Sequence, residues 1–172
     1  MTLEAGTFVT RALTGKPVVL PIQAKDKPAT MSWAGAVGVM IARLAGKEEA
    51  LGEKFIAATA EHNTWGEIAE IYRELIGVQY EWVDKEVYLK IMSKNQEQIS
   101  PYVRYQLEYA RMFDRITDNS KILRVTGMKQ EDLMPFYEGM KKELSGIKLE
   151  DIRIDEYRAG INARMEAYYA NC

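Results

Sequence analysis

The sequence predicts a helix-rich α/β domain. Short apolar segments of strand character recur along the chain, helical patterns of apolar residues lie between them, and Gly or Pro residues separate the two. The strand candidates are "PVVLPI", "KFIAAT" and "VQYEWV", at residues 17–22, 54–59 and 78–83. A length of 172 residues suits one domain, which we assign to residues 1–172, with residues 147–172 as a C-terminal helical extension.

The first part of the chain alternates helix, strand and helix. Residues 3–13 predict a short helix that ends at Gly15, and the apolar run "PVVLPI" between two prolines predicts a strand. The polar segment "AKDKPAT" is a loop, after which "MSWAGAVGVMIARLAG" predicts a helix that ends at Gly46. Because its small residues allow close packing, we expect this helix to be buried on more than one side.

The middle of the chain carries the clearest local signals. Thr64 and Glu67 have the spacing of a capping box, which marks the start of a helix. Apolar residues then recur at helical spacing up to Gly77, namely Trp65, Ile68, Ile71, Tyr72 and Leu75. "VQYEWV" alternates apolar and polar residues as a half-buried strand does, and Asp84 is placed to cap the next helix.

Residues 99–116 predict an amphipathic helix with an aromatic stripe and a charged face. The stripe is formed by Tyr102, Tyr105, Tyr109, Phe113 and Ile116, and the charged face by Arg104, Glu108, Arg111 and Arg115. We expect the stripe in the core and the charged face in solvent; the alternative is that the arginines clamp a diphosphate while the tyrosines stack on a base or sugar. After the turn "TDNSK", two further helical patterns span Leu133 to Leu144 and Leu149 to Tyr168.

Composition and charge exclude several classes of protein. Hydrophobic residues make up 47% and charged residues 28%, which is ordinary for a globular chain, and a net charge of -2 gives no general attraction to nucleic acid or anionic lipid. No apolar stretch approaches the roughly 20 residues of a membrane helix, and the N-terminus lacks a signal peptide's apolar core. The single cysteine, Cys172, allows no internal disulfide. These features predict a cytoplasmic protein without nucleic-acid or membrane partners.

Four segments resemble a known family. "GEKFIAATAEHNTWGEIAEIYRELIG", residues 52–77, looks like the late part of extended short-chain dehydrogenase/reductases, the NAD-dependent nucleoside-diphosphate-sugar epimerase/dehydratase family. "FDRITDNSKILRVTG" and "MPFYEGMKKEL" resemble later elements of that family, and with "TGKPVVLPI" the likeness spans roughly residues 10–146 in the family's order. The resemblance implies the C-terminal, substrate-binding portion of such an enzyme.

The resemblance also implies that a cofactor half is missing. In the family a Rossmann half comes first, and its glycine-rich turn binds the cofactor pyrophosphate. None of the 12 glycines here has that spacing. NAD(P) is thus implied for the intact family only, and we expect no cofactor site in this chain and no catalysis by the chain alone.

The candidate binding residues are cationic. We name Arg104, Arg111, Lys121 and Arg124 as substrate-binding candidates for a nucleotide sugar, next to the plainer roles of surface charge, loop contact and helix capping. Tyr137 and Lys141 match the family's catalytic Tyr-x-x-x-Lys spacing, but they lie in the closing helix, so we name no catalytic residue. His62 has no acidic residue at metal-ligand spacing, so we expect a surface turn residue and no metal site.

Three hypotheses for function remain open. The first is a truncated epimerase-like substrate-binding lobe that is inactive alone and works with a separate Rossmann-domain partner. The second is a non-catalytic interaction module, because the 31–46 helix and the 54–59 strand would expose an apolar patch and a free strand edge without the missing half. It predicts a homodimer or a hetero-complex. The third is a nucleotide-sugar binding domain without chemistry.

Overall fold

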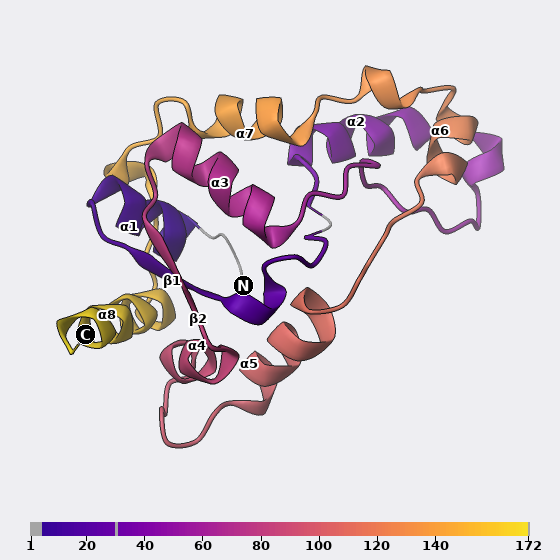
Figure 1. Cartoon of the computed structure of the whole chain (residues 1–172). Coiled ribbons are helices and arrows are strands. Elements are labelled where there is room, and N and C mark those ends of the chain that lie inside the picture. The colour runs from indigo at the N-terminus through magenta and orange to yellow at the C-terminus, as the bar shows by residue number, and fades with distance from the viewer. Residues whose placement is uncertain (1–4, 30, 172) are drawn as a thin grey trace.

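The computed structural model describes residues 5–29 and 31–171, and its elements are mostly helical (Figure 1). The two strands are β1 (Val18–Pro21) and β2 (Tyr80–Val83). The α-helices are α1 (Thr10–Leu13), α2 (Ala34–Leu44), α3 (Trp65–Ile76), α4 (Lys85–Met92), α5 (Pro101–Gln106), α6 (Ser120–Thr126), α7 (Phe136–Leu144) and α8 (Glu156–Ala170). Short 3-10 or π-helical turns lie between them at η1 (Ala5–Val9), η2 (Ile22–Ala24), η3 (Glu48–Ala50), η4 (Leu107–Arg111), η5 (Gln130–Asp132) and η6 (Leu149–Asp151).

The two strands form a parallel pair at the centre of the larger hydrophobic cluster. Val18 lies opposite Tyr80 and Pro21 opposite Val83, and every residue of β1 is buried. The cluster packs β1 against helices α3 and α4 through Ile68 and Leu89. Because parallel strands need a long crossover, α2 and α3 lie between β1 and β2 in the chain. The prediction of a helix-rich α/β domain is confirmed.

The start of α3 follows its local sequence signals. The Thr64 hydroxyl accepts a hydrogen bond from the Glu67 N–H at 3.2 Å, and the Glu67 carboxylate accepts one from the Thr64 N–H at 2.7 Å, which is the predicted capping box. Gly77 ends α3 with a φ of 68°, a backbone conformation that favours glycine. Asp84 caps α4 by accepting from the Glu86 N–H at 2.8 Å.

The segment 54–59, "KFIAAT", is not a strand, so that prediction was wrong. Its backbone is held by side chains: the Thr59 N–H donates to the Ser32 hydroxyl at 2.9 Å, and the Asn119 side chain donates to the Ala58 carbonyl at 2.8 Å. Phe55 and Ala57 pack on a second, smaller hydrophobic cluster formed by Ala36, Met40, Ile122 and Leu133. An apolar run becomes a strand only when a partner strand forms hydrogen bonds with its backbone N–H and C=O groups. Here side chains form hydrogen bonds with this backbone.

Helix α2 is also less buried than its small residues predict. Only Ala36 and Met40 are buried, both facing the smaller cluster, whereas Val39 is 45% exposed and Ile41 56% exposed. Helix α2 packs on α6 (Figure 1). The expectation of burial on more than one side was therefore wrong, and α2 exposes Val39 and Ile41 on the two flanks of its buried Met40.

The 99–116 segment has the opposite orientation to the one predicted. It forms α5 and the π-helical turn η4, and its buried residue is Leu107, with Val103 packed against the larger cluster. The aromatic stripe points away from the core, since its side chains are all more than half exposed. Arg104 and Glu108 lie on the inner side, where they form ion pairs with residues of α4.

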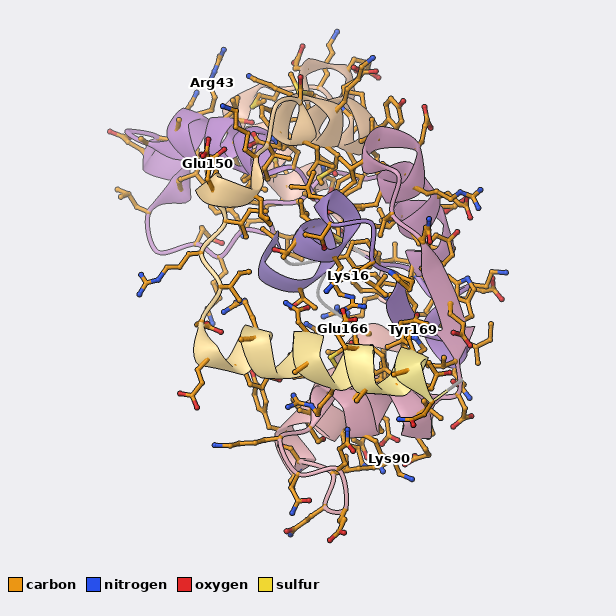
Figure 2. All side chains as sticks on the ribbon, turned by 90° about the vertical axis from the view of Figure 1, so that its left-hand side faces the viewer. Lys16, Arg43, Lys90, Glu150, Glu166 and Tyr169 are labelled. Carbon is orange, nitrogen blue, oxygen red and sulfur yellow. The ribbon has the colours of Figure 1, made fainter. Side chains whose placement is uncertain are left out.

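The predicted C-terminal extension packs against the start of the described chain. Helix α8 contacts η1 and α4, and Ile161 and Met165 are buried in the larger cluster. Arg11 of α1 is only 2% exposed, and its Nη1 lies 2.8 Å from the Glu166 Oε1 of α8; Lys16 and Glu166 are labelled side by side in Figure 2. The predicted N-terminal helix is a π-helical turn followed by α1, while its residues 3 and 4, and Cys172, lie outside the described residues.

Candidate functional site

The first candidate residue, Arg104, is bound to two carboxylates. Its Nη1 and Nη2 lie 3.0 and 2.8 Å from the two carboxylate oxygens of Glu86, and Nη1 lies 2.8 Å from the Glu108 Oε1. Glu108 also accepts from the Lys85 Nζ at 2.9 Å. The pKa values of Glu86 and Glu108 are lowered, first by the side-chain hydrogen bonds from Arg104 and from Lys85 respectively. Arg104 thus already has the carboxylate partners that a diphosphate would have to displace.

Arg111 stabilises the end of the π-helical turn. Its guanidinium donates to the Gln106 carbonyl at 3.0 Å and to the Gln106 side chain. Its own carbonyl accepts a hydrogen bond from the Trp65 indole N–H at 3.1 Å. These contacts connect the turn to the start of α3.

Lys121 and Arg124 lie on α6, far from the other two candidates. The Lys121 Nζ lies 2.6 Å from the Glu53 carboxylate and 3.0 Å from the Lys54 carbonyl, above the Phe55 ring at 4.8 Å. Arg124 is exposed. In Figure 1, α5 lies at the lower edge and α6 at the upper right, so the four cations form two separate pairs rather than one site.

The Tyr137 and Lys141 pair lacks the electrostatics of a catalytic tyrosine. The Tyr137 hydroxyl donates to the Glu74 carboxylate at 2.5 Å, and this hydrogen bond is the main reason that the pKa of Tyr137 is raised. A proton-transferring tyrosine needs a lowered pKa, which a nearby cation would supply. The environment of Tyr137 supports leaving this pair out of the site.

At the turn after β2, the Asp84 side chain accepts hydrogen bonds from the backbone and from Gln23. The Asp84 carboxylate accepts hydrogen bonds at the start of α4, and the Gln23 side chain donates to it at 2.7 Å. The pKa of Asp84 is lowered, first by the Glu86 N–H. A pyrophosphate bound at this turn would need free amide groups, and here the Glu86 N–H already donates to Asp84.

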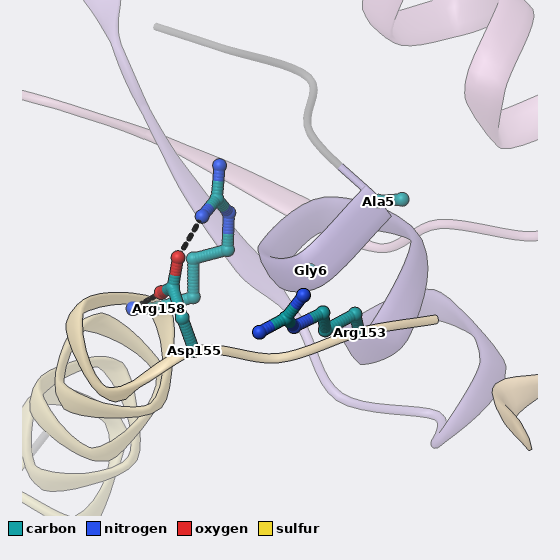
Figure 3. Close-up of a pocket in the computed structure, with 5 residues that line it drawn as sticks. All are labelled: Ala5, Gly6, Arg153, Asp155 and Arg158. Carbon is teal, nitrogen blue, oxygen red and sulfur yellow. Dashed lines mark hydrogen bonds and ion pairs between the residues drawn. The ribbon is translucent and has the colours of Figure 1, made fainter. Parts of the chain in front are cut away.

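A cavity of about 420 Å³ lies between η1 and the start of α8 (Figure 3). It is lined by Ala5, Gly6, Arg153, Asp155 and Arg158. Asp155 caps α8 by accepting from the Arg158 N–H at 2.9 Å and also pairs with the Arg158 guanidinium. Gly6 lies so close to the Arg158 side chain that a Cβ at this position would overlap it. Because Asp155 already pairs with Arg158, Arg153 is the cation that this cavity offers to a small anionic group.

A second cavity, of about 520 Å³, lies beside the start of α3. Tyr80 and Trp82 of β2 line it with their rings 5.7 Å apart, edge to face, and the Lys25 Nζ lies 5.9 Å from the Trp82 ring centre. Burial, and then the hydrogen bond to Glu70, raise the pKa of Tyr80 to about 12, so this phenol is neutral at physiological pH. The cavity offers an aromatic wall and one cation, but three carboxylates, Asp26, Glu67 and Glu70, also line it, so its charge is negative overall.

Metal and membrane features are not found in the part of the chain that the structure describes. Within residues 5–29 and 31–171 no group of three or more His, Cys, Asp or Glu side chains is placed to hold a metal ion. His62 is exposed, as predicted for a turn residue. Among these same residues, no helix combines the length and the apolar character that crossing a membrane requires.

The sequence analysis missed Arg11, Arg153 and Arg158. Arg11 gave no signal, because an arginine among apolar residues looks like a solvent-exposed position until its partners are known. Arg153 and Arg158 had a local signal in "RIDEYR", where Asp155 has the N-cap spacing to Arg158. Comparison of the chain with protein-family models, with curated proteins and with solved structures finds no match.

Proposed function

We propose that this chain is the substrate-binding lobe of an epimerase-like protein, which works with a separate cofactor-binding partner and is inactive alone. One observation carries the proposal: the segments expected to face the missing half expose apolar side chains. We call them the α2 surface, defined by Val39 (45% exposed) and Ile41 (56%) on α2 and by Ile56 (50%) in the 54–59 segment. Removing such aliphatic groups from water stabilises a protein by about 25 cal/mol per Å² of apolar area. Their exposure therefore favours a partner that covers them.

The chemistry of the described residues supports a binding role within this proposal. The Glu86 N–H at the turn after β2 already donates to Asp84, and the Tyr137 pKa is raised rather than lowered. The first cavity offers Arg153 for a phosphate, and the second offers the Tyr80 and Trp82 rings for stacking on a base or sugar, although its carboxylates outnumber its one cation. The lobe would therefore hold a nucleotide sugar, and hydride transfer would need the partner.

The interaction module is the second candidate, because the same α2 surface favours it. It differs from the first in predicting no small ligand. The nucleotide-sugar binding domain differs in predicting a ligand without any need of a cofactor-binding partner.

The test is a thermal-shift and calorimetry series on the purified chain with two ligand panels, nucleoside-diphosphate sugars and nicotinamide dinucleotides. We expect a nucleotide sugar to raise the melting temperature, with about 2.7 kcal/mol of stabilisation when it is present at about 100 times its dissociation constant. We expect no heat from a nicotinamide dinucleotide at micromolar concentration, and such binding by the chain alone would overturn the proposal.

Two further readouts separate the alternatives. No shift with any nucleotide sugar favours the interaction module. If a nucleotide sugar does bind, the next step is to read the DNA upstream of the codon for Met1 for a Gly-rich strand-turn-helix segment. Any protein encoded there is then co-expressed with this chain, and hydride transfer is assayed. Variants Arg153→Ala and Lys25→Ala locate the ligand, with Arg43→Ala on α2 as a control outside both cavities.

A further inference from the structure

The aromatic stripe of the 99–116 segment forms a second exposed apolar surface, distinct from the α2 surface. Its side chains are exposed by 55% to 72%. They are Tyr102, Tyr105 and Tyr109 on α5 and η4, and Phe113 and Ile116 in the segment that follows; we call them the aromatic face. The Tyr105 and Tyr109 rings stack at 5.6 Å with an interplanar angle of 29°, so part of the face is flat.

The orientation of this face is fixed from the inner side of the helix. Leu107 is buried and Val103 packs on the larger cluster. Arg104 connects Glu86 of α4 with Glu108 of its own segment, and Lys85 pairs with Glu108. A rotation that buried the tyrosines would break these ion pairs and expose Leu107, so the aromatic face is held outward.

The aromatic side chains of the face supply more than half of what one partner of a dimer buries. An aromatic side chain has about 150–250 Å² to bury, so the four aromatic side chains, each more than half exposed, offer on the order of 500 Å². A standard interface buries about 800 Å² per partner, and apolar patches beyond a few hundred Å² mark interaction sites. Exposed aromatic residues, tyrosine above all, are typical of interface cores.

We infer that a second copy of this chain covers the aromatic face, giving a homodimer. A two-fold interface brings the same surface of both copies together, so it must be self-complementary. Tyrosine hydroxyls are both donors and acceptors and can pair with their own kind.

The edge of the face carries charges of both signs. Asp114 and Arg115 are adjacent and exposed, and Asp114 lies 3.1 Å from the Lys27 Nζ. In a two-fold arrangement the Asp114 of each copy can therefore face a cation of the other copy.

Sedimentation of the full chain over a range of concentrations tests the inference. We expect a dimer in the wild type, and at least a tenfold weaker association in the double variant Tyr105→Gln with Tyr109→Gln; glutamine keeps a high helix preference. The matched control is Val39→Gln with Ile41→Gln, which removes two exposed apolar side chains from α2 and should leave the dimer unchanged.

Circular dichroism of each variant at low concentration checks that the monomer is folded, which we expect because both altered side chains are exposed. A wild type that stays monomeric at all concentrations overturns the inference. So does a dimer that survives the tyrosine variant, or one that only the α2 variant dissociates. The oligomeric state does not depend on nucleotide-sugar binding, so failure here and failure of the proposed function are separate results.

Discussion

At the scale of single residues, Trp33 determines how closely α2 and α7 approach. Its ring lies over Gly35 of α2 and Gly139 of α7, since a Cβ at either glycine would overlap the indole. The indole N–H donates to the Glu143 carboxylate at 2.9 Å, and the Lys142 Nζ lies 5.3 Å from the ring centre.

Two glycine substitutions test this contact at residue scale. Gly139→Ala should reduce the free energy of unfolding by about 1–3 kcal/mol, because the new methyl group must displace the Trp33 ring. Gly38→Ala, in α2 with open space around it, should instead raise it by about 0.5–1 kcal/mol, since alanine is the better helix former. Urea unfolding measures both. Equal effects of the two changes would show that helix preference alone decides and that the Trp33 contact is unimportant.

At the scale of elements, the predictions that held were those with short-range causes. Thr64 with Glu67, Gly77 and Asp84 act within one turn of their own helix, so the sequence alone predicts them. The orientation of α5 depends on Lys85 and Glu86, which are about twenty residues away in the chain. The same holds for "KFIAAT", whose backbone is satisfied by Ser32 and Asn119.

The candidate site also depends on contacts between residues far apart in the chain, which the sequence pattern does not reveal. Arg104 and Lys121 pair with carboxylates of this chain, and the sequence pattern cannot tell an internal carboxylate from the phosphate of a ligand. Which cations converge depends on the tertiary arrangement, and the four candidates separate into two pairs on α5–η4 and α6.

The α4–α5 ion pairs predict an acid-dependent stability at element scale. The pKa of Glu86 is lowered in the folded chain, mainly by the hydrogen bond from Arg104. A lowered pKa contributes stability above the ordinary value of 4.5, and this contribution is lost as pH falls through the lowered value. Glu86→Gln should therefore melt below the wild type at neutral pH, with the difference shrinking as acid protonates Glu86.

Melting curves from neutral pH to about pH 3 measure this difference, within the range where Arg104 keeps its charge. Glu49→Gln, in the exposed turn η3, is the control and should show no pH-dependent difference. A gap between Glu86→Gln and wild type that stays constant with pH would mean that the ion pair adds nothing to stability.

At the scale of the whole molecule, α8 joins the two ends of the described chain. Its buried Ile161 and Met165 belong to the same cluster as Phe8 and Val9 of η1. The Tyr169 hydroxyl donates to the Val18 carbonyl of β1 at 3.0 Å, and Asn162 donates to the Gly6 carbonyl at 3.2 Å. The segment that the sequence presents as an extension therefore closes the core around η1 and β1.

Arg11 is a buried polar side chain at the contact between α1 and α8. Its side chain is 2% exposed and donates to the Pro17 carbonyl at 2.6 Å and to Glu166 at 2.8 Å. Lys16 lies 3.2 Å from the same Glu166 but is 50% exposed. The pKa of Glu166 is lowered first by Lys16 and only then by Arg11, which would rank Lys16 as the more important partner. For unfolding, burial decides instead, because solvent screens the Lys16 pair.

Arg11→Ala should thus lower the free energy of unfolding by about 3 kcal/mol, since it leaves the Pro17 carbonyl without its donor and opens a cavity under α8. Lys16→Ala should cost less than about 1 kcal/mol. Chemical denaturation of both variants, followed by tyrosine and tryptophan fluorescence, measures the two changes. If Lys16→Ala proved the more damaging, the connection between α8 and the rest of the chain would be a surface ion pair, and residues 147–172 would be an appendage rather than part of the core.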